Sequence, residues 1–199
     1  YLTAYVALVC RGNIESGESL LVHGAAGGVG LAAVDLGIHY GAKVIATSAS
    51  SIKREFLSSY GAHHVLPDSG FKDKVKELTS GNGVDIIYDP VGGDVFDESV
   101  RCIAWNGRLL VIGFTSGRIP NIGVNMPLIK GFSVVGVRGG EYGRRDPEMG
   151  RKNLEAIDAL ASKGKLNPHI HKTYAIDNTV DALNELRNRT VIGKVCIKP

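Results

Sequence analysis

A glycine-rich turn separates a strand-like run from a helix-like run early in the chain. The apolar residues 20–22 lead into Gly24-Ala25-Ala26-Gly27-Gly28-Val29-Gly30, and apolar residues at helical spacing continue to residue 40. In a parallel α/β sheet, this succession presents backbone N–H groups and the positive end of a helix to a dinucleotide pyrophosphate. The turn therefore predicts a site for a nicotinamide cofactor, with close packing alone as the alternative.

Apolar stretches of strand length alternate with segments of helical period along the next hundred residues. We expect strands at residues 19–25, 43–48, 64–67, 84–89, 108–114 and 133–138, and helices at residues 28–40, 51–60, 71–79 and 95–105. Gly61, Gly81 and Gly107 are expected to end three of these helices. The strands are continuous apolar runs, so helices should cover both faces. The pattern predicts an α/β fold, a doubly wound parallel six-stranded Rossmann sheet in the order 3-2-1-4-5-6.

The two ends of the chain do not fit into that sheet. Residues 1–16 carry an apolar helical face over residues 2–13, and this face needs a partner. Residues 17–164 contain the expected sheet and a helix at residues 146–163. Residues 165–199 contain an irregular stretch, an expected helix at residues 178–189 and a last strand at residues 193–198. Both ends are therefore interpreted as connections to something outside the sheet.

Composition excludes several classes of protein. The 199 residues are 44% hydrophobic and 22% charged, as in ordinary globular proteins, and no run approaches the roughly 20 apolar residues of a membrane span. A net charge of +3 without basic clusters argues against nucleic-acid binding. The three cysteines, Cys10, Cys102 and Cys196, lack metal-ligand spacing, so we expect no metal site and no disulfide framework. Because no disulfide framework is expected, a reducing compartment is favoured, and we expect the cytoplasm. Mitochondria and peroxisomes stay open as alternatives because Tyr1 is not a natural start.

The end of the second expected strand bears on the choice of cofactor. A free ribose 2′-hydroxyl is normally held by an acid about 20 residues past the glycines. Residues 46–51 read Ala-Thr-Ser-Ala-Ser-Ser, with Lys53 and Arg54 just beyond. Hydroxyl groups and a cation suit a 2′-phosphate, so NADPH is favoured over NADH, with an exposed basic helix face as the alternative. Ser50 and Lys53 also fit the S-x-x-K pattern of penicillin-recognising acyl transferases, but its companion motifs are missing.

Histidines and one acid are weaker candidates for chemistry. His23 falls within the first expected strand and is interpreted as a buried, hydrogen-bonded residue. We expect surface or packing roles for His63, His64, His169 and His171. Asp89 is the acid best placed at the expected crevice, with bracing of the adjacent turn as its alternative role.

Several motifs together resemble one family. They are the run of residues 24–30, the turn Asp89-Pro90-Val91-Gly92-Gly93, the segment from Gly107-Arg108-Leu109 to Gly113-Phe114, and the closing Gly193-Lys194-Val195. The chain is similar over its whole length to the quinone oxidoreductase (zeta-crystallin-like) branch of the zinc-independent medium-chain dehydrogenases/reductases. The resemblance implies a preceding GroES-like catalytic domain. Residues 1–16 would then be its connecting helix, and residues 165–199 the return to it.

The resemblance also implies which residues contact NADPH. These are Gly27, Gly28 and Val29 at the pyrophosphate; Ser48, Ala49 and Lys53 around the 2′-phosphate; Pro90 and Val91 along the cofactor; Phe114 and Thr115 at the nicotinamide; and Thr3 and Arg189 from the two ends of the chain. Asp68 stands where many relatives have a tyrosine beside the 2′-phosphate, which leaves Lys53 more of that task. No catalytic residue is assigned, because the resemblance places those residues mainly in the preceding domain.

The activity implied by the resemblance is hydride transfer from NADPH to a quinone or an enone. Reduction of enoyl thioesters is the alternative among enzymes, and a cofactor-gated regulator or RNA-binding protein is the alternative outside them. Residues 137–140 would line one lip of the substrate cleft. The apolar strand at residues 133–138 would otherwise be an exposed edge, and the resemblance implies that it pairs across a homodimer.

Overall fold

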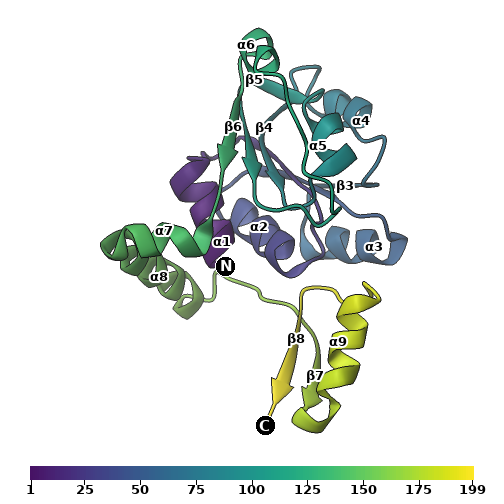
Figure 1. Cartoon of the computed structure of the whole chain (residues 1–199), viewed down its shortest axis with the longest axis vertical. Coiled ribbons are helices and arrows are strands. Elements are labelled where there is room, and N and C mark those ends of the chain that lie inside the picture. The colour runs from purple at the N-terminus through teal and green to yellow at the C-terminus, as the bar shows by residue number, and fades with distance from the viewer.

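The computed structural model describes residues 1–199, and its centre is a six-stranded, all-parallel sheet (Figure 1). The strand order is β3-β2-β1-β4-β5-β6, which confirms the predicted doubly wound topology. The strands are β1 (Ser19–Val22), β2 (Lys43–Thr47), β3 (His64–Leu66), β4 (Val84–Asp89), β5 (Ile103–Val111) and β6 (Ser133–Gly136). Strands β1 and β4 are neighbours, so the loops after them lie side by side at one edge of the sheet.

Helices cover both faces of the sheet, as the continuous apolar strands predicted. On one face, α2 (Gly28–His39) and α3 (Ser51–Tyr60) contribute to a core that includes Leu20 and Val22 of β1. On the other face, α4 (Lys72–Leu78) and α5 (Gly93–Ser99) contribute to a core that includes Leu21. Helix α3 ends as expected at Gly61, whose φ of 113° is the left-handed conformation that favours glycine.

The region between α5 and β5 corrects the sequence prediction. Helix α5 ends at Ser99 instead of residue 105, and β5 begins at Ile103, five residues earlier than expected. Ile103 pairs with Val84 of β4, so burial of these two side chains between strands prevails over the helical spacing. Gly107 consequently lies inside β5 and is not a helix stop. Another helix, α6 (Asn125–Lys130), was not expected.

The N-terminal segment packs against the sheet domain from one side. The predicted helix over residues 2–13 is instead a short α1 (Leu2–Tyr5) followed by η1 (Val6–Arg11), a π-helical stretch with buried Val6, Ala7 and Leu8. These three side chains join the same core as Leu31 and Val34 of α2, which is the partner that the apolar face required. Helices α7 (Gly139–Arg145) and α8 (Pro147–Ser162) lie beside this segment, and α7 was not predicted.

The last part of the chain extends away from the large sheet (Figure 1). Strands β7 (Ile170–Ala175) and β8 (Lys194–Lys198) form a two-stranded parallel sheet, connected through η2 (Ile176–Asn178) and α9 (Thr179–Arg187). One contact returns this part to the glycine turn, because the Gly193 N–H donates to the Ala26 carbonyl over 2.8 Å. No helix of the structure has both the length and the apolar character to cross a membrane.

Candidate functional site

The glycine turn after β1 leaves the first N–H groups of α2 without side-chain partners. Helix α2 begins after Gly27 with no side-chain cap and no acidic residue in its first turn, so its positive end faces outward unneutralised. A Cβ on Gly30 would overlap the Gly24 carbonyl oxygen and lie 2.8 Å from the Ala25 Cα. Only glycine at position 30 therefore lets the first turn of α2 lie this close to the preceding turn. The turn can therefore hold an anion against backbone N–H groups.

A cavity of about 650 Å³ opens beside this turn, and we call it the glycine cleft. It lies at the carboxyl ends of β1, β2 and β4, where a doubly wound sheet binds ligands. Eight of the residues expected at the cofactor line it: Gly27, Gly28, Ser48, Ala49, Lys53, Val91, Thr115 and Arg189. Residues from five separate stretches of the chain thus converge on one cavity.

The loop after β2 presents one half-buried cation to the glycine cleft. The Lys53 ammonium donates to the Arg189 carbonyl over 2.7 Å, and burial together with Arg189 lowers the pKa of Lys53. Arg54 points back instead, because its guanidinium donates to the carbonyls of Ser48 and Ala49. The Ser50 hydroxyl caps α3 by accepting from the Lys53 backbone N–H, so the S-x-x-K pattern here is a helix cap.

His23 lies directly after β1 instead of inside it, and it is fully buried. Its Nε2 lies 2.8 Å from the Ser99 hydroxyl and its Nδ1 lies 2.9 Å from the Thr47 hydroxyl. Ser99 donates its own proton to the Val95 carbonyl, so Nε2 carries the ring proton and Nδ1 accepts from Thr47. Burial lowers the pKa of His23 to about 3, so the ring is neutral and ties β1 to β2 and α5.

Asp89 braces the turn that carries Pro90, which was its alternative role. Its carboxylate is buried and accepts from the Val91 and Gly92 N–H groups over 2.8 and 2.9 Å. Burial raises the pKa of Asp89 although these two donors act in the opposite direction. Asp68 and Asp94 line the glycine cleft together with Lys53, and Asp94 is paired with Arg118 over 2.8 Å.

Four residues expected at the cofactor lie outside the lining of the glycine cleft. Val29 is exposed in the first turn of α2, and Pro90 lies against the turn near Gly24. Phe114 lines a different hollow, described below. Thr3 packs on Gly139, where an added Cβ would meet the Thr3 Cα at 2.9 Å.

The sequence analysis missed several residues that the C-terminal part brings to the glycine cleft. Leu186, Val191 and Gly193 line it, and Lys194 places its ammonium 3.1 Å from where a Cβ of Gly28 would be. This ammonium lies at the N-terminus of α2, where an anion would be stabilised. The Gly193-Lys194 pair was visible in the sequence, but nothing local showed that the chain returns to the glycine turn.

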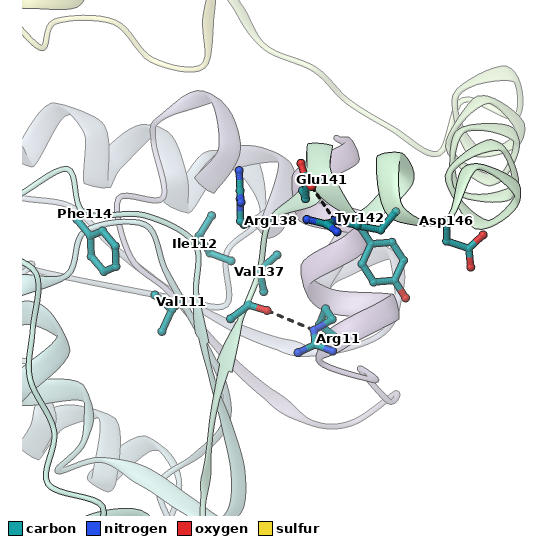
Figure 2. Close-up of a pocket in the computed structure, with 11 residues that line it drawn as sticks. Arg11, Val111, Ile112, Phe114, Val137, Arg138, Glu141, Tyr142 and Asp146 are labelled. Atoms are coloured by element: carbon teal, nitrogen blue, oxygen red, sulfur yellow. Dashed lines mark hydrogen bonds and ion pairs between the residues drawn. The ribbon is translucent and has the colours of Figure 1, made fainter.

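A second cavity, of about 730 Å³, lies on the other side of the loop after β5, and we call it the arginine hollow (Figure 2). Val111, Ile112 and Val137 lie between Phe114 on one side and Arg11 and Tyr142 on the other. The remaining lining residues are Gly136, Arg138, Glu141, Arg145 and Asp146. Val137 and Arg138 belong to the expected substrate lip.

The contacts of the other histidines agree with the surface and packing roles that were expected for them. His63 accepts from the Val44 N–H, and His169 packs on Phe56 with ring centroids 4.6 Å apart. His171 lies 3.4 Å from Glu185 on the C-terminal unit. The structure contains no group of three or more His, Cys, Asp or Glu side chains placed to hold a metal ion.

Comparison with known proteins identifies the chain's relatives. The family model described as zinc-binding dehydrogenase matches residues 28–162. A quinone oxidoreductase-like protein 2 homolog of Nematostella vectensis is 39% identical over 99% of this chain and 55% of its own length. An acryloyl-coenzyme A reductase of Sulfurisphaera tokodaii is 30% identical over 94% of the chain and 53% of its own length. The chain thus spans about half the length of these relatives.

Solved structures agree with the sequence relatives. A mycobacterial protein complexed with NADPH superimposes with a TM-score of 0.87 at 30% identity, covering all of this chain and 62% of that one. A 2-haloacrylate reductase gives a TM-score of 0.88 at 28% identity, with 62% of its own chain covered. Together with the glycine cleft and the sheet order, these matches show that the chain belongs to the zinc-binding dehydrogenase family, in the quinone oxidoreductase-like branch of the medium-chain dehydrogenases/reductases.

Proposed function

We propose that this chain is the NADPH-binding part of a reductase that acts on a quinone or an activated alkene. When bound, the nicotinamide would supply the hydride, and the protein would supply orientation and exclusion of water. The observation that carries the proposal is the glycine cleft itself. It joins the uncapped N-terminus of α2 to a loop after β2 that has a cation and no acid.

The residues of the cleft fit a dinucleotide along its length. Gly27 and Gly28 at the start of α2 would hold the pyrophosphate, with Lys194 adding charge from the C-terminal part. Val91, in the turn that Asp89 braces, and Thr115 would follow the cofactor toward the nicotinamide.

Preference for NADPH over NADH rests on the charges near Ser48. Lys53 and Arg189 meet there, and each can donate to a 2′-phosphate. Asp68 opposes them from the same cavity, whereas the other lining carboxylate, Asp94, is already paired with Arg118. Two cations against one carboxylate still favour the phosphate, and the solved mycobacterial neighbour carries NADPH.

Titration of the chain with NADPH and NADH tests this proposal. We expect NADPH to bind more tightly, and Lys53→Ala to weaken NADPH by about tenfold while leaving NADH unchanged, since one charge-assisted contact is lost. Lys43→Ala is the matched control, because Lys43 is an exposed lysine at the opposite end of β2. Equal affinity for the two cofactors, or unchanged NADPH affinity in Lys53→Ala, contradicts the assignment.

Reduction of an enoyl thioester is the second candidate, favoured by the name of an acryloyl-coenzyme A reductase among the matches. Oxidation of NADPH by the full-length protein, followed in parallel with a quinone and with acryloyl-coenzyme A, separates the two. Faster turnover of the thioester would replace the quinone as the proposed substrate.

We also propose a homodimer through β6, at the edge of the sheet, with Val134 exposed. Light scattering should give twice the chain mass for the wild type and the mass of one chain for Val134→Lys. A monomeric wild type refutes the homodimer.

The three unpaired cysteines favour a reducing compartment such as the cytoplasm. Imaging of the tagged full-length protein tests the compartment.

A further inference from the structure

The arginine hollow combines an apolar floor with positive charge. Val111, Ile112, Phe114 and Val137 supply the apolar surface, with Arg11 and Arg138 around it (Figure 2). Arg145 is a third arginine of the lining. Such a cavity suits a ligand that has an apolar body and an anionic end.

Two of the three guanidinium groups have no carboxylate partner. Arg145 is engaged by Glu141 over 2.9 Å, and Glu141 also accepts from Arg144. Arg11 uses only its Nε, on the Gly136 carbonyl. The exposed Arg138 guanidinium makes no hydrogen bond or ion pair within the chain.

The carboxylates of the hollow do not cancel these two arginines. Glu141 is shared by Arg144 and Arg145, and Asp146 accepts from the Met149 N–H at the start of α8. Arg11 and Arg138 come from η1 and from the connection between β6 and α7. The fold therefore brings two uncommitted guanidinium groups from distant segments to one apolar cavity.

The hollow adjoins the glycine cleft through consecutive residues. Phe114 lines the hollow and Thr115 lines the cleft. An added Cβ on Gly92, another lining residue of the cleft, would lie 3.0 Å from the Phe114 ring. A molecule in the hollow would lie beside the loop that we assign to the nicotinamide end of the cofactor.

We propose that the arginine hollow binds the anionic group of the substrate, with Arg138 and Arg11 as specificity-determining residues. The ligand chemistry is a carboxylate or a phosphate attached to an apolar, unsaturated chain. Guanidinium groups recognise both anions through paired hydrogen bonds, and the apolar floor would hold the chain. The inference rests on the proposed function, since it assumes a substrate that is reduced beside the glycine cleft.

Calorimetric titration of the chain with three ligands that share the crotonyl group tests this inference. The ligands are crotonate for the carboxylate, crotonyl-coenzyme A for the phosphate, and neutral crotonamide. We expect at least one anion to bind more tightly than crotonamide, and Arg138→Gln to weaken that anion by about tenfold while leaving crotonamide unchanged. Arg11→Gln should act in the same direction, and added salt should weaken the wild type.

Arg101→Gln is the matched control, because Arg101 is exposed, has no side-chain partner and precedes β5 at the opposite end of the sheet. Loss of crotonate binding alone in Arg138→Gln identifies a carboxylate, and loss of crotonyl-coenzyme A binding alone identifies the phosphates. Equal affinity for anions and crotonamide, or equal effects of the Arg101 and Arg138 variants, overturns the inference. NADPH is titrated separately in every variant, so failure of cofactor binding is recognised as failure of the proposed function.

Discussion

The glycine cleft and the arginine hollow lie on either side of the loop after β5, but they are built in different ways. The cleft depends on backbone: the turn before α2 requires Gly30, and Asp89 and His23 hold the adjoining loops by hydrogen bonds. The hollow depends on side chains that distant segments bring together. Substitutions in the glycine turn of the cleft should therefore reduce stability, whereas substitutions of Arg11 or Arg138 in the hollow should alter binding alone.

The largest effect is expected from Gly30→Ala. Its Cβ would overlap the Gly24 carbonyl and contact the Ala25 Cα at 2.8 Å, and neither is the movable end of a side chain. We expect the free energy of unfolding to fall by about 3 kcal/mol in urea denaturation, as for severe overpacking.

Gly140→Ala is the matched control for this substitution. Gly140 lies in α7 with open space around it, so an added methyl should be neutral or should stabilise by up to about 1 kcal/mol. Similar losses in both variants would show that the glycine turn is no more constrained than an exposed helix.

A smaller effect concerns the pH dependence contributed by His23. The pKa of His23 is lowered from 6.5 to about 3 in the folded chain, so only the unfolded chain takes up the proton between these values. Stability from this residue is fully present above pH 6.5 and falls by about 1.4 kcal/mol per pH unit below it. His23→Gln lacks this proton uptake.

The measurement is urea denaturation of both proteins over the same pH series. As the pH falls below 6.5, the unfolding free energy of the wild type should fall more than that of His23→Gln. A difference that is constant with pH would mean that His23 can be protonated in the folded chain.

The contrast between the backbone-built cleft and the hollow built from distant side chains also explains how much of the structure the sequence could predict. The strand order and the glycine turn follow from local signals, namely continuous apolar runs and glycines at a strand–helix junction. Lys53 was found because it lies in the first turn of the helix that follows β2. The roles of Lys194 and Arg11 were not found, because their positions depend on how the two ends of the chain pack. Hydrophobic periodicity carries no information about this packing. The early start of β5 was missed because pairing of Ile103 with Val84 is a contact between strands.

Asp146 belongs to the arginine hollow but should behave as a structural residue. Its carboxylate accepts from the Met149 N–H over 2.9 Å and so caps α8. We expect Asp146→Ala to lower the free energy of unfolding by about 1 kcal/mol, and Asp146→Asn to retain most of it because the amide oxygen still accepts. Thermal denaturation of the two variants checks this, and equal losses would show that charge, instead of capping, is what matters there.

Arg138→Gln should have the smallest effect on stability. The side chain is exposed and makes no hydrogen bond or ion pair, so we expect urea denaturation to give an unfolding free energy within about 0.5 kcal/mol of the wild type. A loss as large as that of Asp146→Ala would mean that Arg138 holds the hollow together. An unchanged stability combined with weakened anion binding would separate the two regions: the backbone of the glycine cleft maintains the fold, and the unpaired charge beside Phe114 is free to select a ligand.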